Sequence, residues 1–134
     1  MSILDIRQIL ETRVAQIEPV ISIAGENVPF EPVDDQPYMA VYIMFGEPEN
    51  PEMGSGFREV GVMQINLVYP MQIIGTGSAE HQAEIIRDQF QRGDSFQKNG
   101  VTVVINRTPQ ISQGQQVNGR WVVPIKIWFY SNNF

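Results

Sequence analysis

Few residues in this chain are of the types that carry enzyme chemistry, and none of them stands in a catalytic motif. His81 is the single histidine and cysteine is absent, so the usual histidine-rich and thiolate zinc sites are excluded. Nucleophilic catalysis by serine would need a pattern such as G-x-S-x-G, which the sequence lacks. His81 falls in the first turn of an expected polar-faced helix, where we expect a solvent-facing side chain. The sequence therefore predicts no catalytic residue, no metal, no cofactor and no enzymatic activity.

Three carboxylates are crowded into the stretch GEPENPEMGSGFR, residues 46–58. Acid–base catalysis by two carboxylates needs the fold to fix their separation, and a calcium loop needs a ligand spacing that is absent here. The prolines and glycines of this stretch instead predict a solvated, mobile loop. The alternative is a loop that becomes ordered on a partner or lines a shared surface. On that alternative, the candidate partner-contact residues are Glu47, Glu49, Glu52, Met53 and Phe57.

The stretch GVMQINLVYPMQIIGTG, residues 61–77, ends in a glycine turn ahead of an expected helix. Such a turn can hold a phosphate on backbone N–H groups. A Walker-type loop, however, needs a longer glycine spacing followed by Lys and Ser or Thr, and Glu80 would compete with a phosphate at the helix start. We therefore expect Gly75 and Gly77 only to relax the backbone between a strand and a helix capped by Ser78.

Charge and composition limit the partners that the chain can bind. The net charge is −6 and the nine basic residues are scattered, so nucleic-acid binding through a basic patch is not expected. No apolar stretch approaches the roughly 20 residues of a membrane span, and the N-terminus lacks the pattern of a signal peptide. Charged residues make up 18%, below the roughly 25% of typical domains, whereas Gln and Asn number 13 and 8. Such a surface suits contact with other chains, because amides lose less than charges on desolvation, although it is also normal variation.

Two segments have the apolar spacing of an amphipathic helix. The first, residues 2–17, begins with Ser2 and Asp5 as a capping box and stops before Pro19. The second, residues 79–92, follows Ser78 as its N-cap and has Gly93 as its C′ residue. The first apolar stripe is Ile3, Ile6, Leu10, Val14 and Ile17, and the second is Ala79, Ala83, Ile86 and Phe90.

The remaining regular segments read as strands. Residues 38–45 are apolar at both alternating sets, which indicates a strand buried on both faces or covered by another subunit. Residues 60–69 alternate, and pairing should end at Pro70, which has no N–H to donate. Further strands are expected at 20–24, at 101–105 and from Trp121 to Phe129, with Trp128 and Tyr130 on the second face of the last one. Asn99-Gly100 and Asn118-Gly119 are expected at tight turns.

The order of these elements predicts an α+β fold, because strands follow one another instead of alternating strictly with helices. We expect a two-layer sandwich in which two helices pack on one face of a mixed, mostly antiparallel sheet. A length of 134 residues suits a single domain, residues 1–134.

Residues 61–90 and 118–131 together resemble a phage family, the tail terminator or tail completion proteins of long-tailed phages and prophages. The first segment has a strand that begins with glycine, carries a Gln-Ile pair and ends at proline, then a glycine-containing link and an amphipathic helix ending in phenylalanine. The second segment, NGRWVVPIKIWFYS, matches the long final strand of the family. The residues that carry the resemblance are Gly61, Gln64, Ile65, Pro70, Gly75, Gly77 and Phe90.

The resemblance implies a structural role. Members of this family form a ring, generally of six subunits, that caps the tail tube, stops its polymerisation and presents a surface to head–tail connector proteins. The expected partners are therefore further copies of the chain, the major tail tube protein and connector proteins, in the host cytoplasm during assembly and then in the virion tail. A ring needs contacts between unlike patches. The alternatives are a head–tail connector or tube-like phage protein and, from a different class, a small ligand-binding or hydrolase domain that uses the acidic loop.

Overall fold

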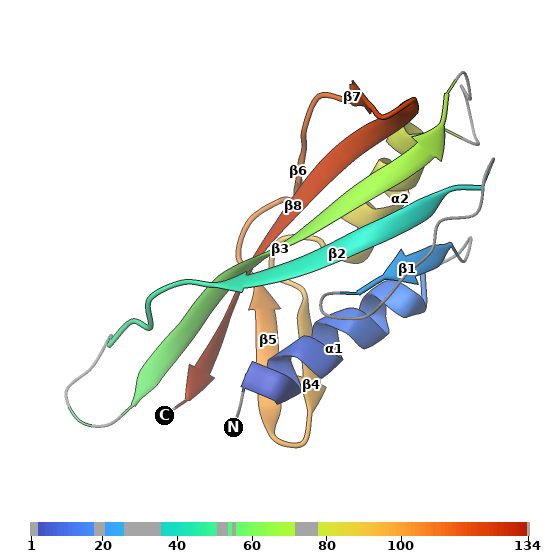
Figure 1. Ribbon diagram of the computed structural model, residues 1–134. Helices are drawn as coiled ribbons and strands as arrows, with labels where there is room; N and C mark the ends of the chain where they lie inside the picture. Colours follow the sequence, from blue (N-terminus) through green and yellow to red (C-terminus); the bar gives the residue numbers. More distant parts are fainter. Residues whose placement is uncertain are drawn as a thin grey trace.

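The computed structural model describes residues 3–17, 21–25, 36–50, 54, 56–71 and 78–133. The described chain forms two helices and eight strands (Figure 1). The helices are α1 (Ile3–Ala15) and α2 (Ala79–Gln89). The strands are β1 (Ser22–Ala24), β2 (Tyr38–Phe45), β3 (Phe57–Pro70), β4 (Ser95–Lys98), β5 (Val101–Ile105), β6 (Gln110–Ile111), β7 (Gln115–Val117) and β8 (Arg120–Asn133).

All eight strands belong to one sheet with the order β1-β2-β3-β8-β5-β4, and β6 and β7 pair with β8. Only the β1–β2 pair is parallel among the described strands. The longest ladder joins β3 to β8, from the pair Phe57–Asn133 to the pair Pro70–Arg120. This ladder is the long twisted ribbon that crosses Figure 1, and the rest of the sheet is built on its two sides.

Two asparagine–glycine turns reverse the chain between neighbouring strands. Asn99 and Gly100 have φ values of 54° and 78° between β4 and β5, and Asn118 and Gly119 have values of 51° and 76° between β7 and β8. Two successive residues with positive φ match the right-handed twist of a hairpin. Both turn predictions are confirmed.

The core lies against one face of the sheet, which we call the inner face. Side chains of both helices and of four strands meet in one buried cluster. The inner-face members are Met39, Val41 and Ile43 of β2, Met63, Ile65, Leu67 and Tyr69 of β3, Val101, Val103 and Ile105 of β5, and Val123, Ile125, Ile127 and Phe129 of β8. The expected stripe of α2 is buried in full, whereas in α1 Ile3 is 47% exposed and Ile9 is buried in addition to the expected residues.

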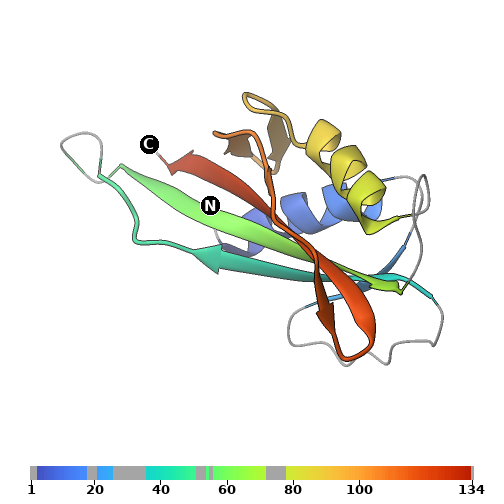
Figure 2. The same ribbon diagram turned by 90° about the horizontal axis from the view of Figure 1, so that it is seen from above.

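The mixed, mostly antiparallel sheet and the two helices are confirmed. Figure 2 shows how strongly the sheet twists along its length, so that it is a large curled sheet. The two-layer sandwich with both helices on one face stays a prediction.

Several element boundaries differ from the sequence prediction. β3 begins at Phe57 instead of residue 60, because β8 continues far enough to pair with it. α2 ends at Gln89: Phe90 is the C-cap, its N–H bonds to the Arg87 carbonyl, and its φ of −130° is not helical. Gly93 is therefore not the C′ residue; its φ is 92° and its N–H donates to the Ile105 carbonyl at 2.7 Å.

The remaining boundary predictions are close to the structure. β2 spans residues 38–45 as expected, and β3 ends at Pro70 as expected. The short first strand is Ser22–Ala24, with Val20 outside the described residues, as is the expected capping residue Ser2. The glutamine-rich segment 110–117 forms the short strands β6 and β7, which its composition did not indicate.

Candidate functional site

The side of β2, β3 and β8 that points away from the core is the candidate functional site, and we call it the outer face. The register of the three strands determines its members. They are Tyr38, Ala40, Tyr42 and Met44 of β2, Val60, Val62, Gln64, Asn66 and Val68 of β3, and Val122, Pro124, Lys126, Trp128 and Tyr130 of β8.

Large apolar side chains remain accessible on this face. Tyr42 is 42% exposed and Met44 is 45% exposed, and Trp128 and Tyr130 are half-buried. The interpretation that residues 38–45 are buried on both faces within the subunit is therefore wrong, because only the inner set is buried. The alternative, that another subunit covers the second set, stays a prediction.

Three arginines stack on aromatic rings of the outer face. The guanidinium carbon of Arg58 lies 4.5 Å from the centroid of the Tyr130 ring, that of Arg107 5.1 Å from Trp128, and that of Arg120 5.6 Å from Tyr38. A cation over an aromatic face is stabilised by the ring quadrupole. These contacts hold the charges close to the sheet.

Hydrogen bonds fix two of these arginines further. Arg58 Nε donates to Asn132 Oδ1 at 2.8 Å, and Arg120 Nη1 donates to the Gln36 carbonyl at 2.9 Å. Because a partly ordered side chain has less conformational entropy to lose, these two arginines would lose less entropy in a contact than free side chains would.

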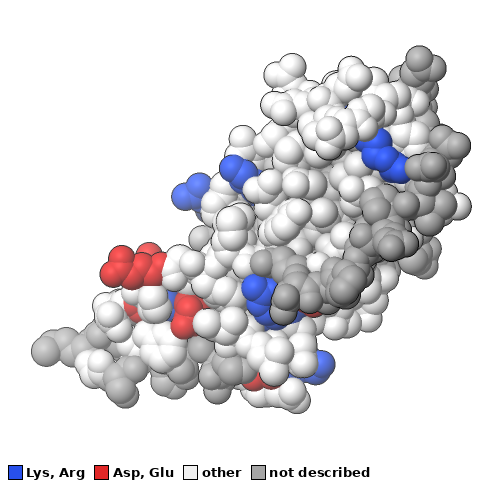
Figure 3. All heavy atoms as spheres, in the orientation of Figure 1, with Lys and Arg blue, Asp and Glu red and all other residues white. Residues whose placement is uncertain are grey.

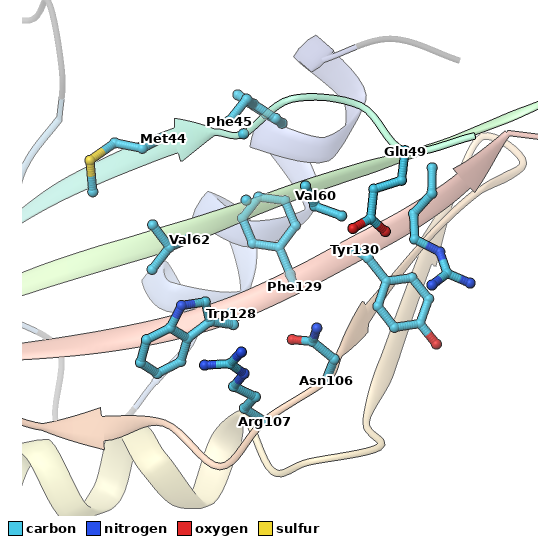
Figure 4. A pocket seen from close by; sticks show the side chains of 13 residues that line it. Met44, Phe45, Glu49, Val60, Val62, Asn106, Arg107, Trp128, Phe129 and Tyr130 are labelled. Carbon is cyan, nitrogen blue, oxygen red and sulfur yellow. The ribbon is translucent and has the colours of Figure 1, made fainter. Parts of the chain in front are cut away.

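A hollow of about 590 Å³ opens at the end of this face where β2 stops. Figure 4 shows the aromatic rings of Trp128 and Tyr130 beside Val60 and Val62, with the Arg107 guanidinium next to the indole and Glu49 at the far end. The lining combines apolar surface with the guanidinium groups of Arg58 and Arg107 and the carboxylate of Glu49, so its charged groups are net positive. Such a hollow suits an apolar segment that also carries a carboxylate.

The acidic stretch 46–58 is only partly a loop. Gly46 N donates to the Val60 carbonyl at 2.8 Å, and Glu49 and Arg58 exchange two backbone hydrogen bonds of 2.8 and 2.7 Å. The chain after β2 therefore continues alongside the beginning of β3 (Figure 1). We call the narrow projection formed by residues 46–50 and 57–58 the arm. The prediction of a loop through residue 58 is wrong at its second end, where Phe57 and Arg58 belong to β3, whereas residues 46–50 are exposed as expected.

The five candidate partner-contact residues do not form one cluster that the structure describes. Glu47 and Glu49 are exposed on the arm, and Phe57 is half-buried at the start of β3. Glu52 and Met53 lie outside the described residues. Within the described ranges, no group of histidine, cysteine and carboxylate side chains could hold a metal ion.

The start of α2 is capped as the sequence predicted. Ser78 Oγ accepts a hydrogen bond from the His81 backbone N–H at 3.2 Å. His81 is half-buried, so it is less solvent-facing than expected. Gly75 and Gly77, which were expected to relax the link before this helix, lie outside the described residues.

One buried tyrosine has a perturbed pKa. Tyr69, on the inner face near the end of β3, is 5% exposed, and burial raises the pKa of its phenol to about 12. The cause is desolvation, which disfavours the charged phenolate. This tyrosine belongs to the core, not to the outer face.

Sequence reasoning missed the cations of the outer face because they are far apart along the chain. Lys126, Trp128 and Tyr130 alternate with the buried residues of β8, and that alternation was the available signal. Arg58 and Arg107 reach the same face from β3 and from the segment after β5, which no local pattern shows.

Comparisons with known proteins agree with the fold. The sequence model of a family described as phage tail terminator protein matches residues 5–129. The chain belongs to the phage tail terminator family. One solved structure that resembles this family member has a TM-score of 0.77 and 26% sequence identity, and the match covers 100% of this chain and 97% of the other. No curated protein matches.

Membership in the tail terminator family makes the chain a structural component of a phage tail and implies a non-enzymatic protein that associates with other tail proteins. The sequence-based recognition of this family is confirmed. Neither described helix is long and apolar enough to cross a membrane.

Proposed function

We propose that this tail terminator caps the phage tail tube as a ring, ends tube polymerisation and presents a surface for head–tail joining. The ring has six subunits of the same single domain, residues 1–134. Assembly takes place in the host cytoplasm, and the ring stays in the virion tail, where it contacts the major tube protein and the connector proteins.

The observation that carries this proposal is the outer face, in a chain of this family. Accessible aromatic and methionine side chains beside stacked arginines have the composition of a protein–protein contact. Tyr42 and Met44 remain accessible on this face, so a ring neighbour or tube subunit can cover it.

The arm residues Glu47, Glu49 and Phe57, with Glu52 and Met53 of the same stretch, are the proposed contact with the tube or the connector. Each contact is weak alone, and six contacts on one tube end hold together because each raises the effective concentration for the next. The free protein is then a monomer, or a concentration-dependent mixture, in dilute solution.

Purified tubes provide the test. In negative-stain images, growing tubes should stop lengthening and show a density at one end when this chain is added, and should continue to lengthen without it. Tubes whose lengths and ends do not respond to the chain would contradict the capping function. Recruitment of the chain to head connectors without any binding to tube ends would favour the alternative role of a head–tail connector.

We also propose that the chain has no catalytic activity. His81→Ala should leave tube capping and folding unchanged, because the described hydrogen bond between His81 and the Ser78 hydroxyl uses the backbone N–H of His81 and not its imidazole. A hydrolytic activity of the purified protein that the substitution abolishes would revive the third alternative, a small hydrolase.

A further inference from the structure

The outer face carries the opposite charge from the chain as a whole. The chain has a net charge of −6, yet three cations follow the outer positions of β8: Lys126 itself, Arg107 over Trp128 and Arg58 over Tyr130. We call these three residues the cation row. Figure 3 shows this side of the molecule as mostly uncharged with scattered basic side chains, and acidic ones gather toward the arm. An acidic partner is therefore favoured.

The surroundings of the cation row indicate a protein partner. Aromatic, methionine and arginine side chains are enriched at the centres of protein contacts, and Tyr42, Met44 and Val62 lie on the same face. A nucleic-acid surface would instead need cations that track a phosphate backbone, without an exposed methionine beside them.

Charge also excludes one way of joining two copies. If two outer faces met about a two-fold axis, the two cation rows would oppose each other, and like charges across a contact are unfavourable. A contact between copies must therefore pair the cation row with a different patch. Contacts between unlike patches generate rings or open arrays.

The same chain presents a complementary patch on α2. Glu80, Glu84 and Asp88 are exposed and recur at every fourth residue, and we call them the acidic stripe. They belong to the side of the helix that is not buried in the core with Ala83 and Ile86. The Trp121 Nε1–H group donates to Glu80 Oε2 at 2.7 Å, which ties this helix to β8.

The two patches have similar spacing. Successive residues of the acidic stripe are about 6 Å apart along a helix axis. Successive outer positions of β8, where the cation row lies, are about 6.7 Å apart along a strand. About one turn of the helix therefore matches two residues of the strand, so three carboxylates can face three cations at once.

We propose that the cation row of one subunit binds the acidic stripe of the next copy, an inference that rests on the proposed ring. The outer face measures about 25 by 15 Å from strand geometry, so the contact covers roughly 400 Å² on each partner, about half of the per-partner area of a stable complex. The contact is weak when isolated and is stabilised by repetition around a tube end.

Charge reversal tests the pairing. Arg107→Glu with Lys126→Glu reverses the row, and Glu84→Lys with Asp88→Lys reverses the stripe. Each variant alone should associate at least tenfold more weakly in sedimentation across a concentration series, and should fail to form rings on purified tubes. An equimolar mixture of the two variants should restore assembly, because each opposed pair of patches again has opposite charges.

The matched control makes the same change of net charge at two residues outside the cation row. Arg92 and Lys98 are exposed and lie outside the row, so Arg92→Glu with Lys98→Glu should assemble as the unmodified chain does. An equal loss in this control, or a mixture that does not recover, would overturn the pairing. Binding of a short DNA duplex that row reversal abolishes, with self-association unchanged, would also overturn it in favour of a nucleic-acid surface.

A covalent test uses the absence of cysteine from the chain. Arg107→Cys combined with Glu84→Cys places one thiol at the centre of each patch, so mild oxidation on tube ends should give a ladder of linked subunits. Tubes that are capped normally but yield no ladder would contradict the pairing of the cation row with the acidic stripe, while still supporting the capping function. Tubes that the unmodified chain does not cap would contradict the capping function itself.

Discussion

The inner and outer faces of β2, β3 and β8 are made from the same three strands but have different compositions. Inner positions of β3 and β8 hold aliphatic residues such as Ile65 and Ile125, both 0% exposed. Neighbouring outer positions hold an amide, a lysine or an aromatic ring, as at Gln64, Lys126 and Trp128. The backbone is common to both faces, so the difference reflects what each face contacts.

The two faces therefore place different requirements on the sequence. Inner residues are determined by packing within the subunit, where a lost methylene leaves a cavity. Outer residues are not required to fill a core, and their types suit the contact with a partner that we propose. Substitutions on the two faces should therefore change different measured quantities.

The largest effect is expected from the centre of the inner face. Ile65→Ala should lower the free energy of unfolding by about 2–5 kcal/mol, because the side chain is fully buried in the core cluster. Urea titration followed by circular dichroism measures this change. A loss below about 1 kcal/mol would show that the two faces differ less in packing than we infer.

Alkaline pH should destabilise the inner face through Tyr69. Its pKa is about 12 in the folded protein and 10.0 when unperturbed, so the neutral phenol is favoured by folding. The stabilisation is complete below pH 10 and is lost as the pH rises from about 10 to 12, by roughly 2–3 kcal/mol for two pKa units. Tyr69→Phe should remove this loss from urea titrations across that range, whereas Tyr42→Phe on the outer face should retain it.

A smaller effect is expected at Gly61, an inner position of β3 opposite Phe129. A Cβ on Gly61 would lie 2.7 Å from Cζ of the Phe129 ring and 2.7 Å from the Met44 carbonyl oxygen. Gly61→Ala should therefore cost about 1–3 kcal/mol as an overpacking change. Combining it with Phe129→Leu should make the two losses less than additive in a double-mutant cycle. Strict additivity would mean that the aromatic ring is not the obstacle.

The smallest effect on stability is expected on the outer face. Tyr42→Thr and Met44→Thr should each change the free energy of unfolding by only about 0.5 kcal/mol, because both side chains are accessible and neither belongs to the buried core. The same substitutions should weaken tube capping in the negative-stain assay. A large loss of stability with unchanged capping would reverse the assignment of the two faces.

Much of the fold could be predicted because local chemistry determines it. Period-two alternation identified β3 and the inner face of β8, and asparagine–glycine pairs identified both tight turns, since each signal acts within a few residues. The cap at Ser78 and the buried stripe ending at Phe90 were predicted for the same reason.

The remainder depends on contacts between distant segments. β3 begins at Phe57 because Asn133 is available to pair with it, and no pattern near Phe57 contains that information. The cation row joins residues from three segments, and Arg107 reaches Trp128 only because the end of β5 pairs with β8. Sequence periodicity describes one strand at a time, so the outer face could be recognised only after the strands were placed side by side.

The two tryptophans of this chain lie on opposite sides of β8. Trp121 is on the inner side and donates to Glu80 of α2, whereas Trp128 is on the outer side beneath Arg107. Intrinsic fluorescence therefore contains two separate signals. In the Trp128→Phe variant, the remaining Trp121 indole reports the detachment of α2 on unfolding. In the Trp121→Phe variant, the remaining Trp128 indole reports what covers the outer face. Folding and ring formation can therefore be timed independently by fluorescence.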